Sequence, residues 1–395
     1  MKKLLILGNG FDLAHELPTK YSHFLDFCRE VINVKTVNPV LGANFFTNSK
    51  TLKFFFNKFD ELDTSAVGKI CELSTGNIWY KYLQDIYEHN IIKGENWIDF
   101  ESEISYIIRI LDEHTISLSH LFCNVMDSLD DNSMDFNIKF KCFSQIVKDW
   151  GFHKLTMREL RSLLFKDLKK LSITLEIYLS EFVLKQPVEV YSPDIEAIEP
   201  NYVINFNYTN TYSKIYHSSI PEFHIHGSCR NDVFVGVNNM VLGIDEYWSE
   251  QERDGHTNFT IFKKFAQRIQ RRTGKEHFEI CNELKELKKN NENERICVYI
   301  FGHSLDVTDK DILEMFFDET FEVTIFCRNE ETEGEYIANV IKIIGEQKLI
   351  ERVNQNPPTI IFQKQADMIG KDPDANVKPD CEEEEEPEED LVTAK

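Results

Sequence analysis

The sequence has no Cys-x-x-Cys pair, although it contains nine cysteines. Cysteine pairs at that spacing are the usual sign of a structural zinc site, and single cysteines scattered along a long chain do not indicate a disulfide framework. We therefore expect neither a metal site nor a fold stabilised by disulfide bonds.

Long apolar runs are also missing at the start of the chain. Only Leu4–Leu7 precedes Gly8 after three other residues, which is too short for a signal-peptide core or a membrane span. We expect a cytoplasmic protein that has no membrane partner.

Basic residues are few, and the formal net charge is -23. Nine of these negative charges fall between Asp380 and Asp390, which leaves -14 for the rest of the chain. A body this acidic repels a phosphate backbone, so nucleic acid is not the expected partner. We expect residues 371–395, which hold the acidic run, to form a disordered tail.

One basic cluster departs from this pattern. It interleaves cations with aromatic residues, namely Lys263, Lys264, Arg268, Arg271 and Arg272 with Phe259, Phe262 and Phe265. We interpret the segment as a helix with one buried face and one solvated face rather than as a nucleic-acid site.

Short apolar runs that end near glycine or polar residues predict buried strands of a parallel sheet. They are Leu4–Leu7, Tyr202–Phe206, Glu222–His226, Ile296–Phe301, Phe321–Cys327 and Thr359–Phe362. Helical patterns separate the first two runs, at Phe100–Leu111, Phe136–Trp150 and Thr156–Val183. We predict an α/β, Rossmann-like parallel sheet formed by residues 1–25 and 196–370, with a large, mostly helical insertion at 26–195.

The first candidate site is the loop that follows the first predicted strand. It contains Gly8, Asn9, Gly10, Phe11 and Asp12 and leads into a helix. Glycines allow backbone N–H groups to approach a phosphate, and a helix N-terminus favours an anion. Asp12 repels phosphate, so we expect it to cap the helix or to bind ribose hydroxyls. A plain tight turn is the alternative interpretation.

Two further candidates follow later strands. Asn207 lies in an asparagine-rich turn, and His226 precedes Gly227 in a His-x-His-Gly segment. Ligands of open α/β sheets bind beyond the carboxyl ends of the strands, where both residues are expected. Ordinary turn chemistry explains Asn207 equally well, and His226 has a structural role or a two-histidine metal site as alternatives.

The fourth candidate loop begins at Gly302 and contains Ser304 and Asp306. We predict a second nucleotide-binding loop here, with capping of the next helix by the segment Thr308–Asp311. An ordinary connection between a strand and a helix is the alternative.

Taken in order, these four segments resemble the AbiH family of bacteriophage abortive-infection proteins. The opening segment Leu7–Ser22 looks especially similar to that family, and the resemblance extends from Leu4 to about Val340. Trp97–Glu101 also looks like a family motif, although Asp99 near a helix start explains part of it. The resemblance implies a role in phage defence.

The same segments are more distantly similar to sirtuin-like NAD-binding domains, including those that hydrolyse NAD. This resemblance implies that Asn207 positions the nicotinamide ribose and water and that His226 is the catalytic histidine. It also implies that Gly8 and Gly10 form the phosphate loop and that Gly302 and Ser304 lie near the adenosine half. Thr209 and Asp12 depart from the pattern, because such domains often have Asp and Ser there. The missing cysteine pairs argue against protein deacetylation.

The resemblance implies an effector that binds NAD and hydrolyses its nicotinamide–ribose bond, an NAD glycohydrolase. An imidazole titrates near neutrality and is suited to accept a proton from water or from a ribose hydroxyl. The alternatives are a sensor that binds NAD or ADP-ribose without turnover and, with less support, a nuclease. A nucleotide is the expected ligand; a phage-derived trigger and a homo-oligomer remain open.

Overall fold

The computed structural model describes residues 1–113, 134–230, 237–245 and 257–370. In these residues a sheet of six strands has the order β4-β3-β1-β5-β6-β7. Its strands are β1 (Lys2–Leu7), β3 (Tyr202–Asn205), β4 (Glu222–His224), β5 (Ile296–Phe301), β6 (Glu322–Cys327) and β7 (Ile360–Lys364). Every neighbouring pair is parallel. The predicted α/β fold is confirmed, whereas the predicted acidic tail lies outside the described residues.

Each strand overlaps one of the apolar runs that predicted it, because helices cover both faces of the sheet. The side chains of Leu4–Leu7 are fully buried at its centre. One face packs on α1 (Asn9–Ala14), α11 (Pro193–Ile198) and α12 (Thr211–Tyr216). The opposite face packs on α14 (Glu276–Asn290), α15 (Lys310–Phe316), α16 (Glu330–Ile344) and α17 (Glu346–Asn354).

The strand order reverses between β1 and β5. The chain adds β3 and β4 on one side of β1, then crosses back and adds β5, β6 and β7 on the other side. Ligands of such sheets bind where the order reverses, in the crevice beyond the carboxyl ends of the strands. The loops that begin at Gly8 and Gly302 follow β1 and β5 and therefore flank this point.

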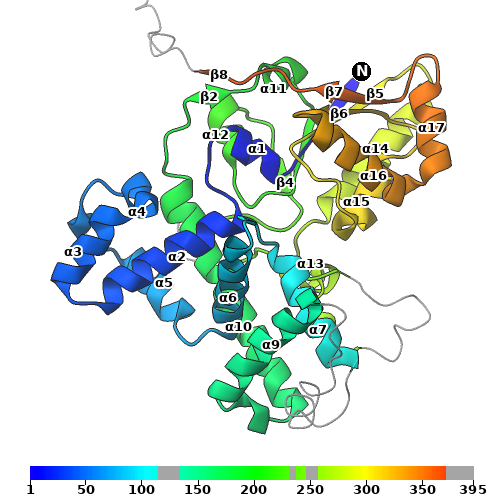
Figure 1. Ribbon diagram of the computed structural model, residues 1–395. Coiled ribbons are helices and arrows are strands. Elements are labelled where there is room, and N and C mark those ends of the chain that lie inside the picture. Colours follow the sequence, from blue (N-terminus) through cyan, green and yellow to red (C-terminus); the bar gives the residue numbers. More distant parts are fainter. Residues whose placement is uncertain (114–133, 231–236, 246–256, 371–395) are drawn as a thin grey trace, which may run out of the picture.

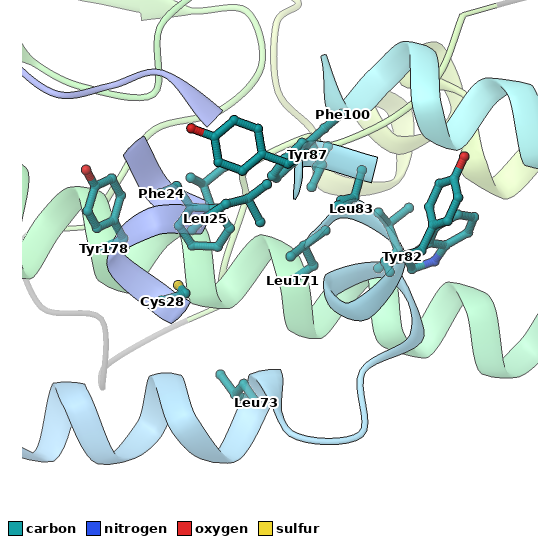
Figure 2. Packing of buried hydrophobic residues seen from close by; sticks show 14 of the residues in the cluster. Phe24, Leu25, Cys28, Leu73, Tyr82, Leu83, Tyr87, Phe100, Leu171 and Tyr178 are labelled. Carbon is teal, nitrogen blue, oxygen red and sulfur yellow. The ribbon is translucent and has the colours of Figure 1, made fainter. Parts of the chain in front are cut away.

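A helical layer formed by the chain between β1 and β3 lies beside the sheet, as Figure 1 shows. Its helices are α2 (Tyr21–Thr36), α3 (Pro39–Asn48), α4 (Lys50–Phe55), α5 (Ser65–Ser74), α6 (Ile78–Ile92), α7 (Phe100–Glu113), α9 (Met134–Asp149) and α10 (Met157–Tyr178). They share one hydrophobic cluster, part of which Figure 2 shows around Phe24, Leu83 and Leu171. Some residues that follow β4 join this cluster, including Met240 and Phe262. The exact domain boundaries stay a prediction.

The helix predicted over Thr156–Val183 is α10, followed by one π-helical segment at Leu179–Val183. The capping box is present: the Thr156 hydroxyl accepts a hydrogen bond from the Glu159 N–H at 3.3 Å, and the Thr156 N–H donates to Glu159 Oε2 at 2.8 Å. None of the helices in the described ranges combines the length and apolar character that crossing a bilayer requires.

The basic cluster forms α13 (Lys264–Arg271), but its buried face is not apolar. Lys264, Gln267 and Arg268 are buried, whereas Phe265 is 42% exposed and Ile269 is 75% exposed. A helix with one buried and one solvated face was predicted correctly, but apolar burial was the expected cause. Lys264 and Arg268 form ion pairs with acidic residues. These pairs explain why cations and not apolar side chains occupy the buried face, since a buried cation is tolerated when it is paired.

Candidate functional site

The glycine loops after β1 and β5 are in direct contact at the point where the strand order reverses. A Cβ atom on Gly8 would lie 2.5 Å from His303 Cα, and one on Gly10 would lie 2.8 Å from Gly302 Cα. Gly302 has a φ of 68°, and a Cβ there would lie 2.2 Å from the Phe11 nitrogen. Glycine is therefore required at these positions so that the two backbones can approach each other.

Backbone carbonyls already accept the N–H groups of the first loop. The N–H of Gly8 donates to Phe301 O at 3.1 Å, that of Gly10 to Gly302 O at 2.7 Å, and that of Phe11 to Gly8 O at 2.9 Å. The first two of these hydrogen bonds join the loop to the end of β5 and to Gly302, and the third closes a turn within the loop itself. The role of these N–H groups in binding phosphate stays a prediction.

The side chains of Phe11 and Asn9, which also belong to this loop, have different partners. Phe11 is fully buried and packs against the rings of His15 and Phe301 at centroid distances of 4.3 and 6.0 Å. Asn9 accepts a hydrogen bond from the Thr19 hydroxyl at 2.7 Å. Phe11 therefore stabilises the interface between α1 and the sheet.

Asp12 is 1% exposed and accepts a hydrogen bond from the Thr209 hydroxyl through Oδ2 at 2.5 Å. Its other oxygen is buried and has no hydrogen-bond partner in the described chain. Burial raises the pKa of Asp12 to about 6, although the hydroxyls of Thr209 and Thr211 oppose this rise. Thr209 and Asp12, the two departures from the sirtuin-like pattern, are thus partners of each other.

Asn207 connects three loops at the carboxyl edge of the sheet. Its Nδ2 donates to Gly8 O at 3.0 Å, and its N–H donates to Asn205 Oδ1 at 2.8 Å. Its carbonyl oxygen lies 2.8 Å from His224 Nδ1. The loops after β1 and β3 and the end of β4 therefore meet at Asn207.

His226 lies in the loop after β4 and faces Asp309 in the loop after β5. Its Nε2 is 3.0 Å from Asp309 Oδ1, and its Nδ1 is buried without a hydrogen-bond partner in the described chain. The residue is 6% exposed. Burial lowers the pKa of His226, and the adjacent Asp309 carboxylate opposes that effect.

A second histidine faces the same carboxylate. The Nε2 of His303 is 3.7 Å from Asp309 Oδ2, and its Nδ1 accepts the N–H of Leu305 at 2.9 Å. Burial lowers the pKa of His303 to about 4, so this ring is neutral at physiological pH. The ring of Phe206 packs edge-on against both imidazoles. Its centroid lies 4.3 Å from that of His303 and 5.7 Å from that of His226.

Lys264 completes this buried cluster. Its Nζ lies 3.2 Å from Asp309 Oδ1 and 2.7 Å from Glu101 Oε2, and its side chain is 4% exposed. Burial raises the pKa of Glu101 to about 7, against the opposing effect of Lys264. Burial alone would also raise the pKa of Asp309, but Lys264, His226 and His303 outweigh it and keep this pKa well below its usual range. Asp309 is therefore ionised, and, against the effect of burial, Asp309 and Glu101 keep the neighbouring Lys264 cationic by raising its pKa.

The ionised carboxylate determines which nitrogen of His226 carries the proton. A carboxylate only accepts hydrogen bonds, so the neutral imidazole places its proton on Nε2, toward Asp309. Nδ1 then keeps a free lone pair. An acidic residue that orients an imidazole and stabilises its protonated form is the arrangement that supports general-base catalysis.

Three further expected site residues also lie outside the cluster formed by Glu101, His226, Lys264, His303 and Asp309. The Asp306 carboxylate caps a short helix by accepting the Thr308 N–H at 2.9 Å. Ser304 is exposed. Gly227 has a φ of 76°, and a Cβ there would lie 2.1 Å from Asn239 O, so its glycine serves a tight turn.

The sequence analysis missed Glu101, Lys264 and Asp309. Glu101 lies in the Trp97–Glu101 segment, in which only Asp99 was given a role, at a helix start. The Asp99 oxygens do accept N–H groups at the start of α7. Lys264 lay within the basic cluster. The sequence feature that could have pointed to Lys264 is its place in a basic segment rich in aromatic residues, within an otherwise acidic chain.

Two cavities in the described chain lie away from His226. The first, of about 510 Å³, is lined by parts of α1, α2 and α4, and the second, of about 720 Å³, by parts of α11 and α12. Asn207 and His226 line neither cavity. Nowhere in the described ranges do three or more metal-binding side chains gather as a metal site.

The sheet topology and the cluster at its carboxyl edge define a Rossmann-like α/β protein with a large helical insertion. The sequence model of the family "Bacteriophage abortive infection AbiH" matches residues 4–326. The chain belongs to this family and is a phage abortive-infection protein. No curated protein and no solved structure matched the chain.

Proposed function

We propose that this chain binds NAD at the carboxyl edge of its sheet and hydrolyses the nicotinamide–ribose bond. The observation that carries the proposal is the contact between His226 and Asp309, which leaves His226 Nδ1 as a buried, unpaired base beside the loops of β1 and β3. The location supports it, because sheets with this strand order bind nucleotides where the order reverses.

In the proposed reaction, a water oxygen bonds to C1′ of the ribose while the bond from C1′ to the nicotinamide nitrogen breaks. Nicotinamide leaves as a neutral molecule, and the proton lost by water passes to His226 Nδ1. The protonated ring is stabilised by Asp309. Such a positioned base is commonly worth about 100- to 10,000-fold in rate.

Asn207 would orient the attacking water or the ribose hydroxyls. Its Nδ2 is bonded to Gly8 O, but its Oδ1 accepts no hydrogen bond from the described chain. That oxygen is free to accept a hydrogen bond from water. The side chain is 6% exposed, as is that of His226, so substrate entry requires the loops to separate. An effector that is held closed until infection fits this enclosure.

The test is release of nicotinamide and ADP-ribose from micromolar NAD by the purified full chain, compared with His226→Gln. Glutamine can still donate to Asp309 but cannot accept the proton, so we expect product release to fall by at least about 100-fold. Calorimetry of NAD binding by the variant separates turnover from binding. NAD binding without product in the wild-type chain, with and without extract from infected cells, would replace the enzyme with a nucleotide sensor.

A further inference from the structure

The cavity of about 510 Å³ is lined by residues at the end of α1 and just after it, and by none of the loop residues Gly8–Asp12 described above. Its walls come from the end of α1, the start of α2, the helix α4 and the residue after β6. Its volume falls within the range of small-molecule sites in proteins. It shares no lining residue with the cluster around His226.

Three cations line this cavity, and each comes from a different element. Lys20 precedes α2, Lys50 begins α4, and Arg328 follows β6. Among the described residues, none of these three has a carboxylate within 4.0 Å. Unpaired cations that converge on one cavity are unusual in a chain of net charge -23 and favour an anionic ligand.

The two carboxylates of the lining do not neutralise these cations. Asp26 is 2.7 Å from the Arg29 guanidinium and accepts the Tyr87 hydroxyl at 3.1 Å. Glu16 is the other lining carboxylate and is exposed. Because Asp26 already has a cationic partner, the three cations face one carboxylate, and the cavity keeps an excess of positive charge.

Aromatic rings form another part of the lining. Phe54 is 53% exposed, and its ring lies edge-on to Phe55 at a centroid distance of 4.9 Å. The centroid of the Phe55 ring in turn lies 5.8 Å from that of Tyr178, which Figure 2 shows near Phe24. An exposed phenylalanine beside cations is suited to stack on a planar base.

We propose that this cavity binds a phosphorylated nucleoside. Lys20, Lys50 and Arg328 hold its phosphates, and Phe54 and Phe55 contact its base. The site is separate from the proposed NAD site and does not depend on NAD hydrolysis. It connects the helical insertion with the sheet, since α4 belongs to the insertion and Arg328 follows β6.

Calorimetry of ADP binding to the full chain tests this proposal. We expect Lys50→Ala and Arg328→Ala each to weaken ADP binding by about tenfold, because each removes a charged contact to phosphate. Phe54→Ala should weaken it severalfold. Lys53→Ala is the matched control: this lysine is exposed on the same helix but does not line the cavity.

Three results would overturn the proposal. They are the absence of ADP binding up to about 1 mM, an ADP affinity that both charge variants leave unchanged, and binding of inorganic phosphate as tight as that of ADP, which would remove the role of the base. NAD hydrolysis is measured separately, so failure of this proposal is distinguishable from failure of the proposed reaction.

Discussion

Nε2 of His226 lies 3.0 Å from Oδ1 of Asp309, although 83 positions separate the two residues in the chain. The loops that carry them follow β4 and β5, strands that lie on opposite sides of β1. The parallel order of the sheet brings both loops to the same edge. The proposed role of His226 as a base depends on this contact.

Replacing Asp309 with asparagine tests the orientation of His226. An amide can donate to Nε2 and thereby favour the tautomer with the proton on Nδ1, where it blocks the base. We expect nicotinamide release to fall by at least about 100-fold, with a smaller change in KM. Asp311→Asn is the control, since that carboxylate is 55% exposed and pairs with Arg268 and not with His226. Equal activity of the two variants would contradict the role of Asp309.

Lys264→Met should destabilise the fold, because it leaves Glu101 and Asp309 buried without their shared cation. The expected loss in the free energy of unfolding is about 3 kcal/mol. Adding Glu101→Gln should recover about 1 kcal/mol or more, since a buried glutamine carries no charge and needs no proton uptake to stay neutral. Urea unfolding measures both, with the exposed Lys275→Met as control. A double variant less stable than Lys264→Met would contradict this interpretation.

Comparing Gly302→Ala with Gly345→Ala separates two costs of an added methyl group: steric contact with neighbouring atoms and strain of the glycine backbone conformation. Both glycines have positive φ, at 68° and 88°, but a Cβ on Gly345 meets nothing within 4 Å. We expect Gly345→Ala to cost about 1 to 3 kcal/mol, because its φ of 88° and ψ of 150° lie in a region that is essentially restricted to glycine. Gly302→Ala should cost about 2 kcal/mol more, because it separates the two glycine loops. Thermal unfolding of the two variants provides the comparison, and equal losses would show that the loop contact is not tight.

Asp12 should make stability depend on pH. Its folded pKa of about 6 lies above the ordinary value of 3.8, so its contribution is fully present below pH 3.8 and is lost as pH rises through 6. Relative to Asp12→Asn, the wild-type chain should lose about 3 kcal/mol between these limits. Urea unfolding of both proteins at several pH values measures the difference. A difference that stays constant with pH would contradict the raised pKa.

The sheet was predictable from the sequence because its strands are short apolar runs that helices cover on both faces. Leu4–Leu7 and Ile296–Phe301 needed only their own composition to be identified. The loops at their ends were also placed correctly, because every parallel strand delivers its carboxyl end to one edge. The spacing of apolar residues and the positions of glycines are local features of the sequence, and they are sufficient to locate strands and the loops that follow them.

The buried cluster could not be predicted in the same way. Glu101, Lys264 and Asp309 come from three separate elements, and their charges are tolerated in the interior only because they compensate one another. Gly8 and Gly10 were predicted to form a phosphate loop and Gly302 to lie near the adenosine half of NAD, and these roles stay predictions. Sequence spacing did not reveal the close contact between the two backbones.

The NAD content of bacteria that express this chain should be followed after phage infection, with His226→Gln expressed at the same level for comparison. We predict that NAD falls and ADP-ribose rises in cells with the wild-type chain, and that both stay at uninfected levels with the variant. If the wild-type chain still blocks phage production while NAD remains intact, then His226 and Asp309 do not form an NAD-hydrolysing site.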